Sequence, residues 1–142
     1  MFEIGAPQPQ DALRIASIHV EAMNTNPLLH VQFPTPEALK DLVEYLARDT
    51  LRCLQDPHKG VLVSRDRETG EIASFAKWVV ARSAEEDLTV EAVVDEPWPE
   101  TSVSEYLDRY SELADAAMER SFGKQPCYRE CLSLISPGSA GT

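Results

Sequence analysis

Residues 59–80 read KGVLVSRDRETGEIASFAKWVV, and they lie between segments with helical patterns on either side. Residues 60–63 are apolar and include two β-branched valines, which favours a strand. Residues 66–70 supply turn-forming side chains, and Gly70 can adopt a positive φ at little cost. Residues 72–79 then alternate like a second strand whose two faces are both at least partly covered. The stretch therefore predicts a β-hairpin.

The chain before the hairpin is expected to form one strand and two helices. Residues 2–4 have the composition of a short strand, and residues 12–23 carry apolar side chains at helical spacing. Residues 24–27 are a cluster of turn formers that should end this first helix. A second helix is expected over residues 36–55, because Thr35 is a suitable N-cap and proline is tolerated at the first helical position.

The chain after the hairpin is expected to form a third helix and one more strand. Residues 83–100 are acidic and irregular, which is typical of a surface insertion. Ser102 and Glu105 match the S-x-x-E pattern of a capping box at the start of the third helix. The last strand is expected over residues 127–135. Residues 136–142 are small and rich in helix breakers, so a flexible tail is expected there.

The length and charge of the chain limit its class and its partners. With 142 residues it is long enough for one domain with its own core. Its 13 basic and 24 acidic residues give a net charge of −11, which argues against nucleic acid or an anionic membrane as the main partner. No apolar run approaches the roughly 20 residues of a spanning helix, and the N-terminus has no secretory signal pattern. A cytoplasmic protein is therefore expected.

The spacing of the cysteines does not predict a metal site. Cys127 and Cys131 form a CxxxC pair, but no histidine or second cysteine pair lies nearby to complete four zinc ligands. Small thiols in the core or at a strand edge are the expected alternative. No metal ligand is predicted.

Several segments resemble one known family. The order β-α-α-β-β-α-β is the front half of a GNAT N-acetyltransferase domain. Residues 2–39, FEIGAPQPQDALRIASIHVEAMNTNPLLHVQFPTPEAL, resemble the opening of fungal GNAT-like proteins, including the NTNPLLH loop. Residues 56–80 are similar to their second and third strands, and GKQPCYRECLSL at 123–134 is similar to the start of their fourth. The resemblance implies an α+β, GNAT-like domain over residues 1–135 with a mixed, partly antiparallel sheet.

The cofactor motif of that family is degenerate here. Family members bind acetyl-CoA where the fourth strand meets the next helix, through a Q/R-x-x-G-x-G/A turn whose N–H groups approach the pyrophosphate. This sequence has only Gly138 and Gly141 there, without the basic lead residue. We expect a chain truncated after its fourth strand, with no cofactor of its own and acetyl-CoA only if another subunit completes the site. Pantetheine would then run beside the backbone of Cys131, Leu132, Ser133 and Leu134.

The resemblance also implies site residues. Many family members place a carboxylate on the fourth strand that deprotonates the substrate amine, and Glu130 lies there, with a solvent-facing glutamate as the alternative. The loop between the first two helices usually forms a wall of the acceptor pocket, and Trp78 on the third strand would face the same cleft. Packed loop residues and a core aromatic are the alternatives. His19 is expected in the core or at its boundary. The expected substrate-binding residues are Asn24, Thr25, Asn26, His30, Phe33 and Trp78.

Two functions remain open, and with them the question of whether the chain is an enzyme. In the first, a GNAT-like protein with a lost or incomplete acetyl-CoA site binds or acts on a small metabolite in the vacated cleft, or serves as an oligomerisation module. In the second, the chain is an N-acetyltransferase that moves an acetyl group from acetyl-CoA to a small-molecule amine, with Glu130 as base. An exposed edge on the fourth strand predicts a homodimer in either case.

Overall fold

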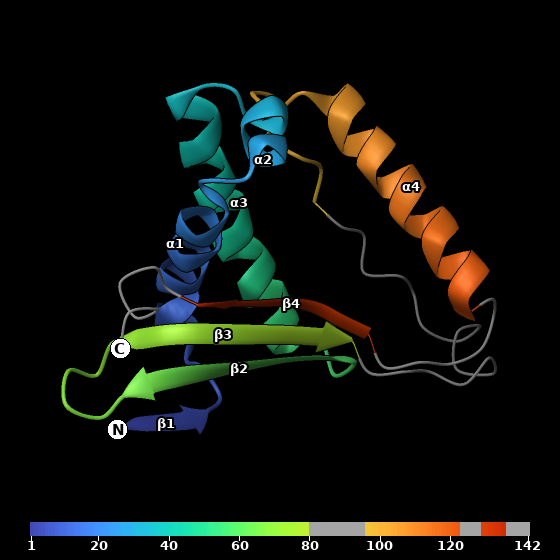
Figure 1. Ribbon diagram of the computed structural model, residues 1–142. Helices are drawn as coiled ribbons and strands as arrows, with labels where there is room; N and C mark the ends of the chain where they lie inside the picture. The colour runs from blue at the N-terminus through green and yellow to red at the C-terminus, as the bar shows by residue number, and fades with distance from the viewer. Residues whose placement is uncertain (80–95, 123–128, 136–142) are drawn as a thin grey trace.

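The computed structural model describes residues 1–79, 96–122 and 129–135, and its elements follow the expected order with two additions, a 3-10 turn and the short helix α2 (Figure 1). A 3-10 turn, Pro9–Asp11, precedes α1. The helices and strands are β1 (Phe2–Gly5), α1 (Ala12–Met23), α2 (Pro27–Gln32), α3 (Pro36–Gln55), β2 (Lys59–Asp66), β3 (Ile72–Val79), α4 (Ser104–Phe122) and β4 (Arg129–Ile135).

The strands form a four-stranded sheet in the order β1-β2-β3-β4. The β2–β3 hairpin is confirmed, and Gly70 in its turn has the expected positive φ of 74°. The α+β fold class is also confirmed. The expected mixture of parallel and antiparallel pairs is not found, because every pair of described strands is antiparallel. The long helices α1 and α3 run in opposite directions, so the chain leaves the sheet along α1 and returns to it along α3. It returns to the edge of the sheet where β1 ended, and β2 therefore runs antiparallel to β1.

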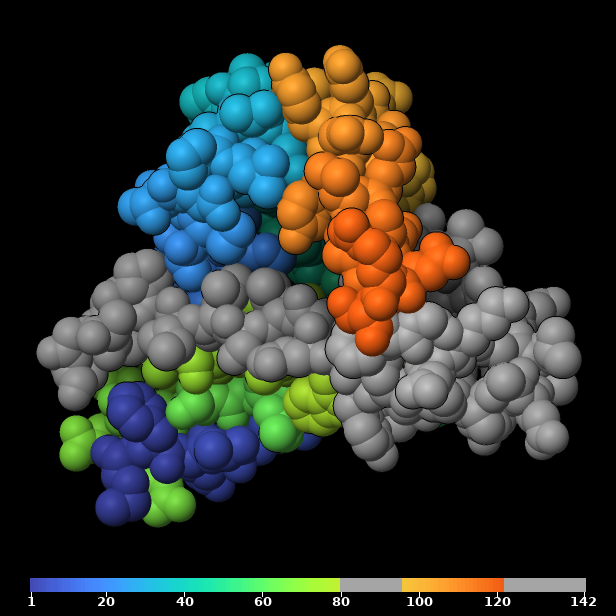
Figure 2. All heavy atoms as spheres, turned by 45° about the vertical axis from the view of Figure 1, so that its right-hand side comes forward, coloured from blue at the N-terminus to red at the C-terminus, as the bar shows by residue number. Residues whose placement is uncertain are grey.

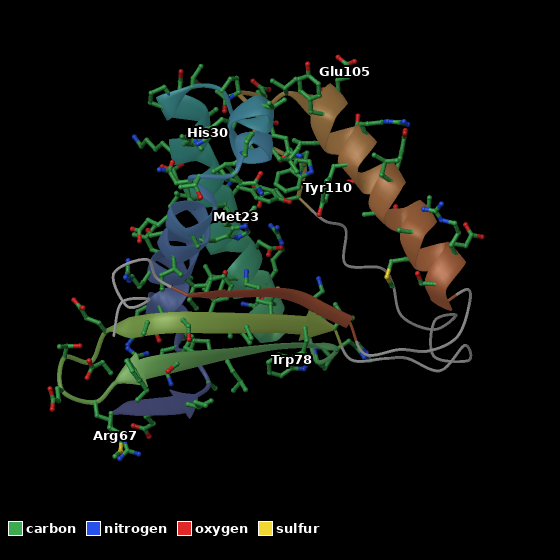
Figure 3. The ribbon with its side chains drawn as sticks, viewed as in Figure 1. Met23, His30, Arg67, Trp78, Glu105 and Tyr110 are labelled. Atoms are coloured by element: carbon green, nitrogen blue, oxygen red, sulfur yellow. The ribbon has the colours of Figure 1, made fainter. Side chains whose placement is uncertain are left out.

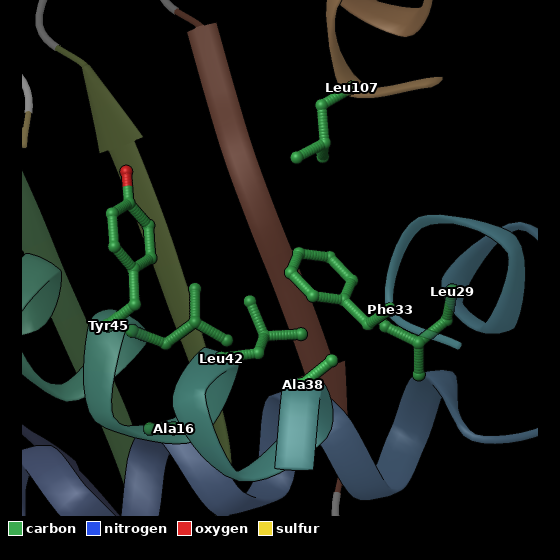
Figure 4. Packing of buried hydrophobic residues seen from close by; sticks show 8 residues of the cluster. Ala16, Leu29, Phe33, Ala38, Leu42, Tyr45 and Leu107 are labelled. Atoms are coloured by element: carbon green, nitrogen blue, oxygen red, sulfur yellow. The ribbon is translucent and has the colours of Figure 1, made fainter. Parts of the chain in front are cut away.

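The helices all lie on one face of the sheet (Figure 1). Side chains on the covered face of the sheet, including Val61, Val63 and Phe75, pack against Ile15 and Ile18 of α1. A second cluster fills the space between the helices (Figure 4). Its buried members are Ala16, Leu29, Phe33, Ala38, Leu42, Tyr45, Leu46 and Leu107.

The opposite face of the sheet is covered by no described helix. The side chain of Ile4 is 74% exposed, and that of Leu62 is 39% exposed. The indole of Trp78 lies on this face against Gly60, its partner in the β2–β3 register. A Cβ atom at position 60 would overlap the indole ring, so the close approach requires glycine there.

The starts of α2 and α3 are both capped by side chains, and only the cap of α3 was expected. The Thr35 hydroxyl accepts a hydrogen bond of 3.0 Å from the backbone N–H of Ala38, which confirms it as the N-cap of α3. The turn formers after α1 do end that helix, but Asn26 also starts α2, which was not expected. Its side-chain oxygen accepts a 3.0 Å hydrogen bond from the N–H of Leu28. The stretch expected to be a loop thus contains a short helix.

The start of α4 differs from the expected capping box. The helix begins at Ser104, and the Ser102 hydroxyl donates a hydrogen bond to the carbonyl of Pro99. The N–H of Val103 donates to the carbonyl of Gln32 at 2.8 Å, which joins this end of α4 to α2. Within the described part of α4 only Leu107 is buried, so the helix contacts the rest of the domain mainly through its first turns. Most of the expected 83–100 insertion, residues 127 and 128, and the expected 136–142 tail lie outside the described residues.

Candidate functional site

The segment 96–103 runs along α3 in the opposite direction and is attached to it at several points. The Glu96 carboxylate accepts hydrogen bonds from the guanidinium groups of Arg52 and Arg48, the latter at 2.8 Å. These bonds, that from Arg52 above all, hold the pKa of Glu96 below its usual range. The Tyr45 hydroxyl donates to the Glu96 carbonyl at 3.2 Å, and the Thr101 hydroxyl donates to Asp41 at 2.6 Å. The segment is therefore held along much of its length.

Trp98 is the aromatic side chain that this segment places over the helices. Its indole stacks on the ring of Tyr45, with centroids 4.6 Å apart and ring planes at 27°. The ring of Phe33 lies 6.1 Å away in a tilted arrangement. The sequence predicted only an irregular insertion here, and the Pro97-Trp98-Pro99 run was the one local signal for an ordered aromatic.

A cavity of about 110 Å³ lies beneath Trp98 and is called the helix cavity here. Its polar wall is formed by His19 and Gln32, and its aromatic wall by Phe33 and Trp98. The remaining wall is aliphatic: Met23, Leu28, Leu29, Leu42, Leu46 and Leu107. In the space-filling view the surface is hollowed between α1–α2 and α4, with atoms of α3 visible at the bottom (Figure 2). The cavity is thus a preformed, mostly apolar site at the junction of all four helices.

His19 is the titratable group of the helix cavity. Its ring lies 6.4 Å from the ring of Phe75 on β3. Its Nδ1 atom is buried and has no hydrogen-bond partner among the described residues. Burial, and secondarily the positive charge of Lys77, lower the pKa of His19 to about 4, so the imidazole is neutral at physiological pH. The expected core or boundary position agrees with this placement, but its contact with a cavity was not foreseen.

Lys77 lies behind His19, between the sheet and α3. Its side chain is buried, and its ammonium group donates to the Thr50 hydroxyl at 2.8 Å. The Asp49 carboxylate lies 3.4 Å from the same nitrogen. Strand alternation could have predicted the burial of Lys77, because Lys77 follows the buried Phe75 by two residues and lies on the same face of β3. The structure thus places a buried charge next to a neutral histidine.

The expected substrate-binding residues do not gather in one pocket. Asn24 and Thr25 line an open depression beside Ser17 and Val20, on a different face of α1 from His19. Only Phe33 contributes to the helix cavity.

The other expected substrate-binding residues have local roles or lie elsewhere. Asn26 caps α2, and the His30 ring hydrogen-bonds through Nε2 to the carbonyl of Asn24. His30 therefore closes the turn between α1 and α2. Trp78 lies across the sheet from the helices (Figure 3), so it does not face the same hollow as the α1–α2 turn.

The expected catalytic and cofactor residues lie on β4. Their positions are described by the backbone register of β4 with β3. Glu130 is in register with Trp78 of β3, and Leu132 with Lys77. Ser133 and Leu134 follow in register with Ala76 and Phe75. Cys131 lies at the register shift between these pairs. Their roles toward acetyl-CoA or an amine remain predictions.

The described residues were also searched for metal sites and membrane spans. Within them, no group of three or more His, Cys, Asp or Glu side chains is placed to hold a metal ion. None of the helices in the described ranges is both long enough and apolar enough to cross a membrane.

Comparison with known proteins supports the fold alone. No family model matches the chain, and no curated protein matches it. A crystal structure described as histone acetyltransferase HPA2 and related acetyltransferase, from Corynebacterium glutamicum, superimposes with a TM-score of 0.57 at 17% identity. The fold is GNAT-like. The match covers 99% of this chain and 64% of that one, so the GNAT-like domain spans less than two thirds of the similar structure's length.

The expected GNAT-like architecture is therefore confirmed, and it relates the domain to acetyltransferases at the level of fold. At 17% identity the similarity carries no substrate, cofactor or catalytic residue with it. The finer expectations, of fungal relatives and of truncation after the fourth strand, remain predictions.

Proposed function

We propose that this GNAT-like domain binds a small metabolite in the hollow between α1–α2 and α4, and that it does so without acetyl-CoA. The observation that supports this function is the helix cavity, a preformed apolar space of about 110 Å³ with two polar side chains in its wall. Concave, mostly apolar sites with few polar groups are the usual form of small-molecule sites. The fixed 96–103 segment favours such a site, because its wall is ordered before a ligand arrives.

Calorimetric titration separates this function from the family chemistry. A panel of small aromatic and aliphatic compounds should include at least one that binds, whereas acetyl-CoA should give no heat at sub-millimolar concentration. Leu107→Phe would place extra volume in the cavity, while Leu113→Phe on the same helix is a matched control at a 55% exposed position. Ligand binding should be lost in the first variant and kept in the second. Equal binding to both variants would contradict the assignment.

The second candidate function is N-acetyl transfer from acetyl-CoA to a small-molecule amine. The structural similarity to an acetyltransferase favours it, together with the presence of a strand at the position of Glu130. Acetyl-CoA would be held beside the backbone of Cys131 to Leu134 in a site completed by another subunit. Release of free thiol from acetyl-CoA in the presence of amines would support this function. Glu130→Gln should then abolish the release while acetyl-CoA binding persists.

We also propose a homodimer through β4, which is compatible with either function. In the described sheet β4 pairs with β3 only, which leaves its other edge available for a strand of a second copy. Sedimentation at increasing concentration should show a monomer–dimer equilibrium. A single monomeric species at high micromolar concentration would contradict the dimer but not small-molecule binding. A cytoplasmic location is retained as a prediction.

A further inference from the structure

The sheet face opposite the helices differs in charge from the solvated face of an ordinary antiparallel sheet, which carries the polar side chains of its strands. Here the Arg65 guanidinium of β2 donates to the Asp11 carboxylate at 2.7 Å, on the helix side of the sheet. The Lys77 ammonium of β3 likewise donates to Thr50 of α3. The described side chains on the other face, called the open face here, are uncharged as far as the hairpin turn: Phe2, Ile4, Leu62, Ser64, Ser74, Ala76 and Trp78.

The open face combines projecting apolar side chains with a hollow. Phe2 and Ile4 are exposed, and the indole of Trp78 lies on the side of the sheet away from the helices (Figure 3). A depression of about 210 Å³ lies beside Ile4 and Leu62. The small side chains that line it are Ser64, Ser74 and Ala76. Contiguous exposed apolar surface is uncommon on monomeric proteins and marks an interaction site.

The charge of the chain favours a second copy as the occupant of the open face. Like charges brought together at an interface are costly, and each copy has a net charge of −11. Two copies therefore meet at least cost where their surfaces are uncharged. Asp66, in register with Phe2, borders the open face at the turn. Its carboxylate accepts a 2.8 Å hydrogen bond from the N–H of Glu68 and so belongs to the turn.

The shape of the open face is self-complementary. A twofold axis brings the same surface of both copies together, so each projection must meet a hollow of the partner. Ile4 stands at the rim of the depression, which allows the side chain of each copy to enter the depression of the other. A cavity of about 150 Å³ holds a benzene ring. The depression, at about 210 Å³, is therefore large enough for an isoleucine side chain.

The area of the sheet sets the strength of such a contact. Its strands have four to eight residues. With a rise of about 3.3 Å per residue and about 4.8 Å between strands, they give a flat footprint of roughly 400 Å². Protruding side chains add to this footprint, so two open faces would bury on the order of 1,000 Å² together, near the lower limit for a specific interface. A weak, reversible dimer of micromolar affinity is therefore expected.

We propose that the open face is the contact surface of a symmetric homodimer, in which Ile4 of each copy enters the depression of the other. This contact differs from strand pairing at β4, because Ile4 lies on β1, at the opposite edge of the sheet. The two contacts do not exclude each other. The helix cavity lies on the other side of the sheet, so each copy of the dimer would keep it uncovered.

Trp78 provides a readout of the open face that strand pairing at β4 does not imitate. In a Trp98→Phe protein it is the one remaining tryptophan of the chain. Its fluorescence quenching by acrylamide should fall as the protein concentration rises through the micromolar range, because the partner copy covers the indole. The concentration at half-change gives the Kd of the open-face contact.

Ile4→Lys and Leu113→Lys form a matched pair of variants in this background. Each adds one positive charge at an exposed apolar position, the first on the open face and the second on α4. Ile4→Lys should raise the Kd by on the order of tenfold or more, since a central side chain of the contact is replaced by a charge. It should do so although the added charge lowers the overall repulsion between the copies. Leu113→Lys should leave the Kd unchanged.

The outcomes separate this dimer from strand pairing and from the proposed function. Quenching of Trp78 that does not depend on concentration would overturn the open-face contact, even if sedimentation shows a dimer. An equal Kd for Ile4→Lys and Leu113→Lys would overturn it as well. If Trp98→Phe does not fold, sedimentation of the two lysine variants replaces the quenching, and equal self-association would overturn the proposal. Small-molecule binding is measured separately with Leu107→Phe, so the two proposals fail independently.

Discussion

The ammonium group of Lys77 on β3 donates a 2.8 Å hydrogen bond to the hydroxyl of Thr50 on α3. Both side chains are buried between the sheet and the helices. The Thr50 hydroxyl in turn donates to the carbonyl of Leu46 at 2.9 Å, so it both accepts and donates inside the protein. The Asp49 carboxylate, 3.4 Å from the ammonium, partly balances the charge. This network ties the hairpin to the helix layer with a polar contact in an otherwise apolar interior.

Thr50→Val should destabilise the domain through Lys77. The substitution preserves the shape of the side chain but removes the acceptor, and an unpaired buried donor costs about 1–3 kcal/mol. Urea denaturation should show a loss of this size. Thr25→Val, at an exposed position in the turn after α1, is the control and should change stability little. In a Lys77→Met background the cost of Thr50→Val should shrink, because the donor is gone. An identical cost in both backgrounds would show that the hydrogen bond is not its source.

Acid should destabilise the domain through His19. Its pKa is about 4 in the folded protein against an ordinary value of 6.5, because burial disfavours the charged imidazolium. Between these two values the unfolded chain binds a proton that the folded protein does not, so stability falls as the pH falls. The stabilisation is complete above pH 6.5 and is lost progressively toward pH 4, with a total of at most about 3 kcal/mol. Urea denaturation at pH 7.5, 6.0 and 4.5 should reveal this slope (~3 kcal/mol at most over the range).

Two variants isolate the contribution of His19 from that of the carboxylates. His19→Leu should flatten the pH dependence between 6.5 and 4 relative to wild type, because it removes the group whose pKa is lowered. His58→Leu should retain the wild-type slope. A His19→Leu protein that loses stability with acid as steeply as wild type would exclude the histidine as the cause.

Gly60→Ala should destabilise the hairpin by steric overlap with Trp78. The new methyl group would meet the indole ring, and overpacking of this kind costs about 1–3 kcal/mol. Gly5→Ala on β1 is the matched control, because nothing lies within 4 Å of a Cβ atom built there. Thermal unfolding should show a clear loss for the first variant and little change for the second. Replacement of Trp78 by Leu in the Gly60→Ala protein should recover part of the loss. Equal stability of the two alanine variants would contradict the overlap.

The candidate site was predicted less well than the fold, and particular residues show why. The motif-based expectation placed Asn24 and Phe33 in one pocket, but the α1–α2 turn divides them between an open depression and the helix cavity. The short helix α2 was missed, since six residues are too few to display a helical period. Trp98 was missed because its position depends on Tyr45, which lies more than fifty residues earlier in the chain. Strand alternation alone does not say which face of β3 the helices cover.

The β2–β3 hairpin, the N-cap of α3 at Thr35 and the alternation of the strands could all be predicted from local sequence patterns. These features depend on interactions between residues a few positions apart, such as a positive φ at Gly70 or a hydroxyl bonded to an N–H three residues on. The shared cavity of His19, Phe33, Trp98 and Leu107 became visible only in the folded domain, as did the burial of Lys77 beside Thr50. Those contacts join residues far apart in the chain, and their geometry is set by how the helices pack over the sheet, which no local pattern encodes.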